Sequence, residues 1–253
     1  MFKNSIPVIA LPGYTVEKKF TSRKNSVYLI KREKASDMPM YLVCKKYTYP
    51  DRMATEVEML SLMKSKGVAV PQVYWQDKEH LLLEYIEGPL LLDCYCWQEE
   101  ISGSDSCCLD TAAHRLINDL CGWFKDFYNA AQSVYGKQIL MGDVNFRNFI
   151  LKERIYGFDL EECYEGRIEK EVGSLCAFAL TYNPCFTKWK MAVIRELIGI
   201  FTYEFNLDRK LLQNDVQEKL LFLAQIRGKE RELKLVLRND LIDKIFNDNA
   251  GNS

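Results

Sequence analysis

The feature that most constrains the fold of this chain is a change of pattern near Glu87-Gly88-Pro89. Short β-prone stretches separated by polar segments precede it, and apolar residues at helical spacing follow it. The 253 residues suffice for one large domain or for two lobes that share a cleft. We therefore expect an α+β protein that divides into a sheet-rich part, residues 1–87, and a mainly helical part, residues 88–253.

The first part is expected to form an antiparallel sheet with one helix. The predicted strands are Val16–Phe20, Ser26–Arg32, Met40–Tyr47, Val73–Trp75 and Leu81–Tyr85. A segment free of Gly and Pro, Arg52–Lys66, stops at Gly67 as a helix does. On this helix Glu56 falls inside the apolar stripe, so its carboxylate points inward and needs a partner.

The second part contains three amphipathic segments that predict helices, namely Asp110–Ala131, Trp189–Phe205 and Leu211–Gln225. Between the first two, Phe149–Leu151 and Ile155–Phe158 flank a polar turn and predict a short β-hairpin. Asp143 and Asn148 precede this hairpin and Asp159 follows it. Because both ends of a hairpin lie together, these three oxygen-bearing side chains are expected to converge.

Composition excludes several classes of protein. The formal net charge of −1 gives no overall field that would attract DNA, and no apolar run approaches the roughly 20 residues of a membrane helix. The first residues, Met1–Tyr14, lack the apolar core of a signal peptide. We therefore expect a soluble, cytoplasmic protein with no DNA or membrane partner.

The nine cysteines are then expected to be reduced thiols. The tightest group, Cys94, Cys96, Cys107 and Cys108, matches the spacing of structural zinc sites poorly. The two histidines, His80 and His114, are distant in sequence from any candidate nucleophile and give little support to a hydrolase triad.

The converging polar residues suit phosphoryl transfer from ATP. That reaction needs bound phosphates, a cation that neutralises their charge and an acceptor hydroxyl aimed at the terminal phosphorus. Mg²⁺ prefers oxygen ligands such as those of Asn148 and Asp159. Asp143 supplies a base, and Lys45 with the inward Glu56 supplies a positioned ammonium.

In this order the motifs resemble the protein-kinase-like superfamily. The run Asp143-Val-Asn-Phe-Arg-Asn148 matches the D-x-x-x-x-N catalytic loop, and Phe158-Asp159-Leu160 stands where kinases carry Asp-Phe-Gly. Similarity is greatest to small atypical members: aminoglycoside and choline phosphotransferases, RIO-type kinases and the small kinase associated with tRNA threonylcarbamoylation. The resemblance implies a bilobal fold that binds ATP and Mg²⁺.

The resemblance also implies a role for individual residues. Lys45 would contact the α and β phosphates and pair with Glu56; strand alternation and motif spacing favour it over its neighbour Lys46. Asp143 would be the catalytic base, and Asn148 and Asp159 the Mg²⁺ ligands. The backbone from Glu84 to Ile86 would receive adenine. Asn25 and Ser26, in a turn that lacks the glycine-rich motif, would cradle phosphates.

Three departures bear on function. Met141 replaces the histidine usual before the catalytic loop, Leu160-Glu161 replaces Phe-Gly, and no long activation segment is present. Glu171 is a candidate acidic anchor for the catalytic loop, whereas Glu161 and Glu162 are expected to be solvated.

These features favour a small-molecule alcohol, such as a sugar, amino alcohol or antibiotic, as phosphoryl acceptor. An atypical Ser/Thr protein kinase and a non-catalytic nucleotide-binding scaffold remain alternatives. The basic stretch from Arg227 to Arg238 is expected to be a solvated helix face with ion pairs, and it only weakly suggests an RNA-linked complex.

Overall fold

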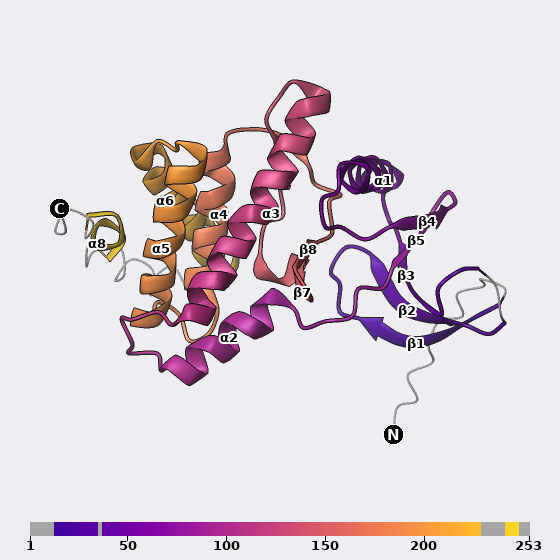
Figure 1. Cartoon of the computed structure of the whole chain (residues 1–253), viewed down its shortest axis with the longest axis horizontal. Coiled ribbons are helices and arrows are strands. Elements are labelled where there is room, and N and C mark those ends of the chain that lie inside the picture. Colours follow the sequence, from indigo (N-terminus) through magenta and orange to yellow (C-terminus); the bar gives the residue numbers. More distant parts are fainter. Residues whose placement is uncertain (1–12, 35–36, 229–240, 248–253) are drawn as a thin grey trace.

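The computed structural model describes residues 13–34, 37–228 and 241–247. A five-stranded sheet with one helix occupies one side of the molecule, and the remaining helices occupy the other (Figure 1). The two sides meet at the chain segment after Glu84 and at a short hairpin. The expected α+β class and the change from sheet to helices near Gly88 are therefore confirmed.

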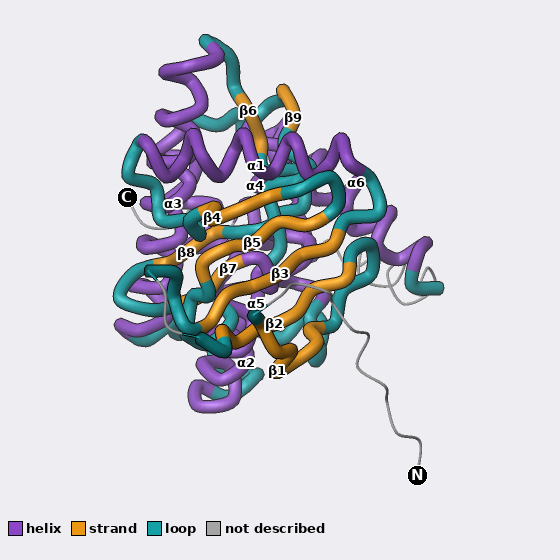
Figure 2. Tube along the Cα trace, turned by 90° about the vertical axis from the view of Figure 1, so that its right-hand side faces the viewer, coloured by secondary structure: helices purple, strands orange, loops and turns teal. Residues whose placement is uncertain are grey.

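The sheet is antiparallel throughout and has the order β1-β2-β3-β5-β4 (Figure 2). Its strands are β1 (Tyr14–Phe20), β2 (Ser26–Arg32), β3 (Tyr41–Lys46), β4 (Val73–Gln76) and β5 (His80–Glu84). Each lies within a residue or two of its predicted position. The register places Lys45 of β3 beside Val27 of β2 and Leu81 of β5, in the interior of the sheet.

Helix α1 (Pro50–Ser65) packs against one face of this sheet and buries five of its residues, Met53, Glu56, Met59, Leu60 and Met63. Glu56 is only 1% exposed, so the predicted inward carboxylate is confirmed. A separate apolar cluster, Tyr28, Ile30, Leu42, Cys44 and Leu82, lies on alternate positions of β2, β3 and β5. Because side chains alternate along a strand, Lys45 projects from the face opposite to Cys44, toward α1.

The helical part consists, among the described residues, of α2 (Leu91–Ser102), α3 (Thr111–Tyr135), α4 (Ile168–Thr181), α5 (Lys188–Phe205), α6 (Arg209–Ile226) and α8 (Leu241–Asn247). The predicted helices correspond to α3, α5 and α6. Sequence patterns did not predict α2 and α4. The basic stretch beyond Gly228 lies outside the described residues.

The predicted hairpin forms from β7 (Phe149–Leu151) and β8 (Ile155–Gly157) and joins the two parts. The Gly157 N–H donates to Ala69 O at 3.0 Å, and Trp123 Nε1 of α3 donates to the same oxygen at 2.9 Å. A Cβ on Gly157 would collide with the Trp123 ring, so only glycine permits this close packing. A second pair, β6 (Ile139–Leu140) and β9 (Tyr164–Glu165), flanks the loop that carries Asp143.

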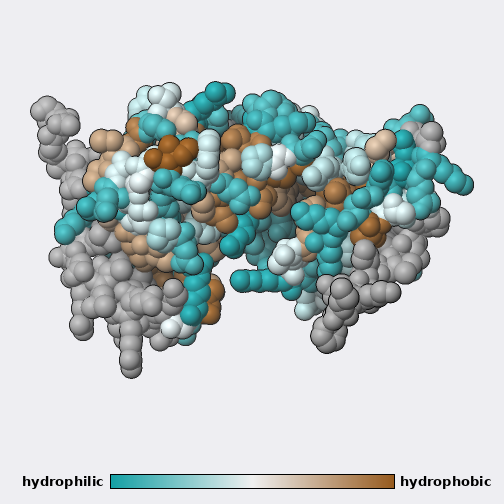
Figure 3. All heavy atoms as spheres, turned by 90° about the horizontal axis from the view of Figure 1, so that it is seen from below, coloured by the Kyte–Doolittle hydropathy of each residue, from teal (hydrophilic) through white to brown (hydrophobic). Residues whose placement is uncertain are grey.

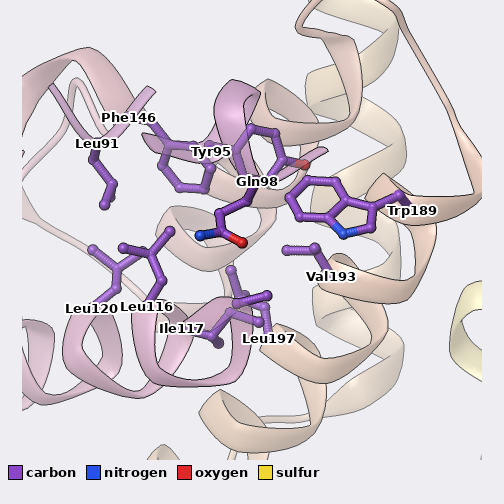
Figure 4. A pocket seen from close by; sticks show the side chains of 11 residues that line it. Leu91, Tyr95, Gln98, Leu116, Ile117, Leu120, Phe146, Trp189, Val193 and Leu197 are labelled. Carbon is purple, nitrogen blue, oxygen red and sulfur yellow. The ribbon is translucent and has the colours of Figure 1, made fainter. Parts of the chain in front are cut away.

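The interior of the helical part contains a buried ion pair and a small cavity. Lys190 of α5 is fully buried and pairs with Glu99 of α2. Nearby, Gln98 Oε1 and Trp189 Nε1 have no hydrogen-bond partner among the described residues, and both side chains line an apolar cavity of about 10 Å³ (Figure 4). That volume accommodates no more than a water molecule, so this cavity is not a substrate site. No described helix is long and apolar enough to cross a membrane.

Candidate active site

Lys45 occupies the centre of the strongest cluster of charges. Its ammonium lies 2.6 Å from Glu56 Oε2 and 2.9 Å from Glu161 Oε2, and it also contacts Asp159 Oδ1. Burial alone would lower the pKa of Lys45, but the charges of Glu56 and Asp159 outweigh burial and raise the pKa well above its usual value. The side chain is therefore a fixed cation.

The neighbouring Lys46 behaves as a surface residue. Its side chain is half exposed and pairs with Glu79 at 3.3 Å. Of these two lysines, Lys45 is the one whose side chain contacts Glu56, the partner that the sequence predicted. Tyr47, two residues further along, donates a hydrogen bond from its hydroxyl to Glu56 and completes the burial of that carboxylate.

The predicted metal ligands Asn148 and Asp159 come together at the open end of the hairpin. The Phe158 N–H donates to Asn148 O at 3.0 Å, which places Asp159 directly beside Asn148. The Asn148 side chain is 7% exposed and donates from Nδ2 to Asp143 O at 2.7 Å. Asp159 has a positive φ of 65°, a conformation that Asp and Asn tolerate better than most residues.

Asp143 lies in the loop before the hairpin, and its Oδ1 accepts a hydrogen bond from Asn145 Nδ2 at 3.1 Å. Residue 142 must be glycine: its φ is 89°, and a Cβ there would overlap the carbonyl group of Glu162. The backbone of the Asp143 loop therefore packs closely against the segment that follows Asp159. Asp143, Asn148 and Asp159 are brought to one region, as the hairpin predicted.

Glu171 of α4 holds the Asp143 loop in place through a hydrogen bond to its backbone. Its Oε1 accepts a hydrogen bond from the Gly142 N–H at 2.8 Å, and its Oε2 accepts one from the Tyr128 hydroxyl at 2.8 Å. Burial raises the pKa of Glu171 to about 7, although both hydrogen bonds oppose the shift. The expectation that Glu171 is the acidic anchor is confirmed.

The expectation that Glu161 and Glu162 are solvated is wrong for Glu161. That side chain is 5% exposed, because it fills the space between Lys45 and the turn that joins β1 to β2. From this turn, Asn25 Nδ2 donates to Glu161 Oε2 at 2.6 Å. Glu162 is partly exposed and pairs with Lys24 and, at 3.3 Å, with Arg52.

Three carboxylates therefore surround one ammonium. Oxygen atoms of Glu56, Asp159 and Glu161 all lie within 4.8 Å of one another. Carboxylates this close repel each other, and Lys45 neutralises only one of their charges. The donor set, entirely oxygen, suits a hard divalent cation such as Mg²⁺. Sequence reasoning named Asp159 for this role but missed Glu161, whose position two residues after Asp159 was the available signal.

The predicted adenine segment leaves β5 at Glu84. The Glu84 carboxylate accepts hydrogen bonds from Lys64 Nζ and from the Gln72 N–H, both at 3.0 Å. These bonds connect β5 to the end of α1 and to the segment before β4. Ile86 is buried. Within the described part of the chain, the backbone of residues 85–87 forms no hydrogen bond with another backbone group. These groups remain available to a ligand.

The surface is hollowed between the sheet side and the helical side, and hydrophilic atoms line the hollow (Figure 3). A pocket of about 460 Å³ lies next to the charge cluster, between the start of α1 and the segment after Leu160. Arg52, Gly142, Glu161 and Glu162 are among its lining residues. Ser26, predicted to help hold phosphates, begins β2 beside Asn25 and is partly buried.

Comparison with known proteins adds no identification. A scan against protein-family models finds no match, and a search of curated proteins finds no significant match.

Proposed function

We propose that this protein is an ATP- and Mg²⁺-dependent phosphotransferase of the protein-kinase-like superfamily that transfers the γ-phosphoryl group to a hydroxyl of a small molecule. In this proposal the sheet and α1 form the nucleotide-binding lobe, and residues 88–253 form the catalytic lobe. The observation that carries the proposal is the arrangement of Lys45. It is buried among Glu56, Asp159 and Glu161, beside the hairpin end that holds Asn148.

The residues present fit a Mg²⁺ ion. Asp159 and Asn148 would hold it, and Glu161 offers a further oxygen within reach of Asp159. When bound, the ion would neutralise charge on the phosphates. Lys45 would bind the α and β phosphates, because Glu56 and Tyr47 hold its neighbourhood fixed.

Asp143 would orient the acceptor hydroxyl and receive its proton. The hydroxyl oxygen would attack the γ-phosphorus while the bond from that phosphorus to the oxygen of ADP breaks. The proton would pass from the hydroxyl to the Asp143 carboxylate and then to solvent. The Gly142 N–H bond to Glu171 and the Asn148 bond to Asp143 O support the loop in this task.

A small-molecule acceptor is favoured over a protein because α4 begins at Ile168, soon after Asp159, and leaves no room for a long substrate-binding segment. A second candidate, a non-catalytic nucleotide-binding scaffold, is favoured by one observation. The Glu161 carboxylate pairs with Lys45 and accepts a hydrogen bond from Asn25, and these are two of the groups that would bind phosphates.

ATP consumption separates the two candidates. We expect purified protein to consume ATP slowly with Mg²⁺, and Asp143→Asn to reduce that rate by roughly 10²- to 10⁴-fold while ATP binding persists. Asp126→Asn, an exposed substitution on α3, is the control. Full ATP consumption by the Asp143→Asn protein would remove Asp143 from the mechanism, and the absence of any consumption in wild type would favour the scaffold.

A further inference from the structure

Three cationic side chains gather at the C-terminal end of α4, and we call them the basic rim: Arg147, Lys219 and Arg227. The Arg227 guanidinium donates to Thr181 O at 3.3 Å. The Arg147 guanidinium carbon lies 5.9 Å from the centre of the Tyr182 ring. These contacts place two of the three cations within one residue of the end of the helix.

Lys219 reaches the same helix from α6. Its ammonium lies 4.9 Å from the centre of the Phe178 ring and 5.4 Å from that of Phe222. Phe178 lies one helical turn before Tyr182, so the third cation borders the same patch. Within the described residues, no member of the basic rim forms an ion pair with a carboxylate.

The basic rim adjoins the loop that carries Asp143. The Tyr182 hydroxyl accepts a hydrogen bond from the Phe146 N–H at 3.0 Å, so the end of α4 is fixed to that loop. The charges that act on Lys219 are those of Asp143, Glu162 and Lys170. Burial lowers the pKa of Lys219, and the Asp143 carboxylate opposes this shift. Lys219 is thus a partly buried ammonium that is close enough to the Asp143 and Glu162 carboxylates for their charges to act on it.

An ammonium that is partly removed from water and has no paired carboxylate is stabilised when an anion binds to it. The groups suited to nucleotide phosphates, Lys45 and Asn25, contact Asp159 and Glu161, whereas Arg147 and Arg227 contact Tyr182 and Thr181 at the end of α4. An anion at the basic rim would therefore belong to the second substrate.

We propose that the basic rim binds an anionic group of the phosphoryl acceptor, so that the acceptor is an alcohol bearing a phosphate or carboxylate. This inference rests on the proposed phosphotransferase function. It disfavours the cationic acceptors, amino alcohols and aminoglycosides, because the positive charges of Arg147 and Lys219 would repel their ammonium groups.

The test measures binding, which does not require turnover. Thermal unfolding of the full chain is followed with phosphorylated and carboxylated alcohols of three to six carbons, each beside its uncharged counterpart, and with ethanolamine and choline. The proteins are wild type, Lys219→Gln and Lys125→Gln. Lys125, on the exposed side of α3, pairs with Glu204 at 2.7 Å and controls for loss of one positive charge. ATP with Mg²⁺ is tested separately on all three.

We expect at least one anionic alcohol to raise the melting temperature of wild type and Lys125→Gln more than its uncharged counterpart does. In Lys219→Gln the apparent affinity should fall about tenfold or more, as expected for loss of one charge-assisted contact. A failure of ATP to bind would contradict the proposed function without altering this comparison.

Three results would overturn the inference: equal binding of anionic and uncharged alcohols, binding of choline or ethanolamine in preference to anions, or undiminished anion binding by Lys219→Gln. Binding of a short RNA that depends on Lys219, with no binding of any small anion, would also overturn it.

Discussion

The side-chain amide of Asn25 donates a 2.6 Å hydrogen bond to Glu161, and this bond fixes the turn between β1 and β2 to the segment after Asp159. Lys24 of the same turn pairs with Glu162, so two adjacent carboxylates hold two adjacent residues of the turn. Carboxylates and phosphates accept hydrogen bonds from the same donors. In the proposed function, Glu161 and Glu162 would thus compete with ATP phosphates for these donors.

Replacing Glu161 with Gln should therefore tighten ATP binding in the absence of Mg²⁺. The neutral side chain competes less strongly for Lys45 and no longer repels the phosphates, so we expect the dissociation constant to fall by roughly 3- to 10-fold. Isothermal titration in EDTA measures it. Glu165→Gln, an exposed residue paired with Lys137, is the control. Unchanged or weaker binding by Glu161→Gln would show that Glu161 does not compete with phosphate.

The two adjacent lysines of β3 should differ sharply in their effect on stability. Lys45→Met removes a buried cation and leaves Glu56 and Glu161 without compensation, which we expect to lower the free energy of unfolding by roughly 2 to 4 kcal/mol. Lys46→Met removes an exposed pair and should change it by less than about 0.5 kcal/mol. Urea denaturation measures both. Equal losses would contradict the assignment of Lys45 as the central cation.

Gly142→Ala should damage both stability and the site. The added Cβ would overlap the Glu162 carbonyl, and φ at this position is 89°, so we expect a loss of roughly 2 kcal/mol or more in the free energy of unfolding. Gly199→Ala is the matched control on α5, where a Cβ meets no atom within 4 Å, and it should stabilise the protein slightly. Equal free energies of unfolding for the two variants would contradict the close approach of residue 142 to the Glu162 carbonyl group.

Glu171 should make stability depend on pH. Its pKa rises from an ordinary value of 4.5 to about 7 on folding, so the folded state holds the proton more tightly. This contribution is fully present below pH 4.5 and is lost as pH rises to about 7, a change of roughly 3 kcal/mol.

The comparison of wild type with Glu171→Gln isolates that effect, because Gln does not titrate. Across this range the variant should gain stability relative to wild type, as measured by urea denaturation at several pH values. A difference between the two proteins that stays constant with pH would mean that Glu171 keeps an ordinary pKa in the fold.

Much of the fold was predictable because its elements carry clear periodic patterns. The strands are β-prone stretches between polar segments, α1 ends just before Gly67, and α3 has a continuous apolar stripe. Helix α4 was missed because it is buried on several sides and contains Gly173, so no polar face marks it. Helix α2 was missed because its buried face, formed by Leu91, Tyr95 and Glu99, includes a carboxylate. That carboxylate is buried because it pairs with Lys190, which is distant in the sequence.

Those parts of the site that depend on short-range sequence patterns were predictable. Asp143, Asn148 and Asp159 converge because a hairpin separates them, and Glu56 faces inward because of helical periodicity. The burial of Glu161 was not predictable, since it results from contacts with Lys45 and Asn25, which lie far away in the sequence. Long-range pairing of charges leaves no periodic signal.

In the proposed function, Asp159 and Asn148 would hold the Mg²⁺ of a bound nucleotide beside Lys45. The most direct measurement is the melting temperature with ATP, in Mg²⁺ and in EDTA, for wild type and Asp159→Asn, because Asn tolerates the positive φ at this position. We predict that Mg²⁺ increases the stabilisation by ATP in wild type and that Asp159→Asn loses this increment. An equal increment in the variant, or none in wild type, would contradict the role of Asp159 as a Mg²⁺ ligand.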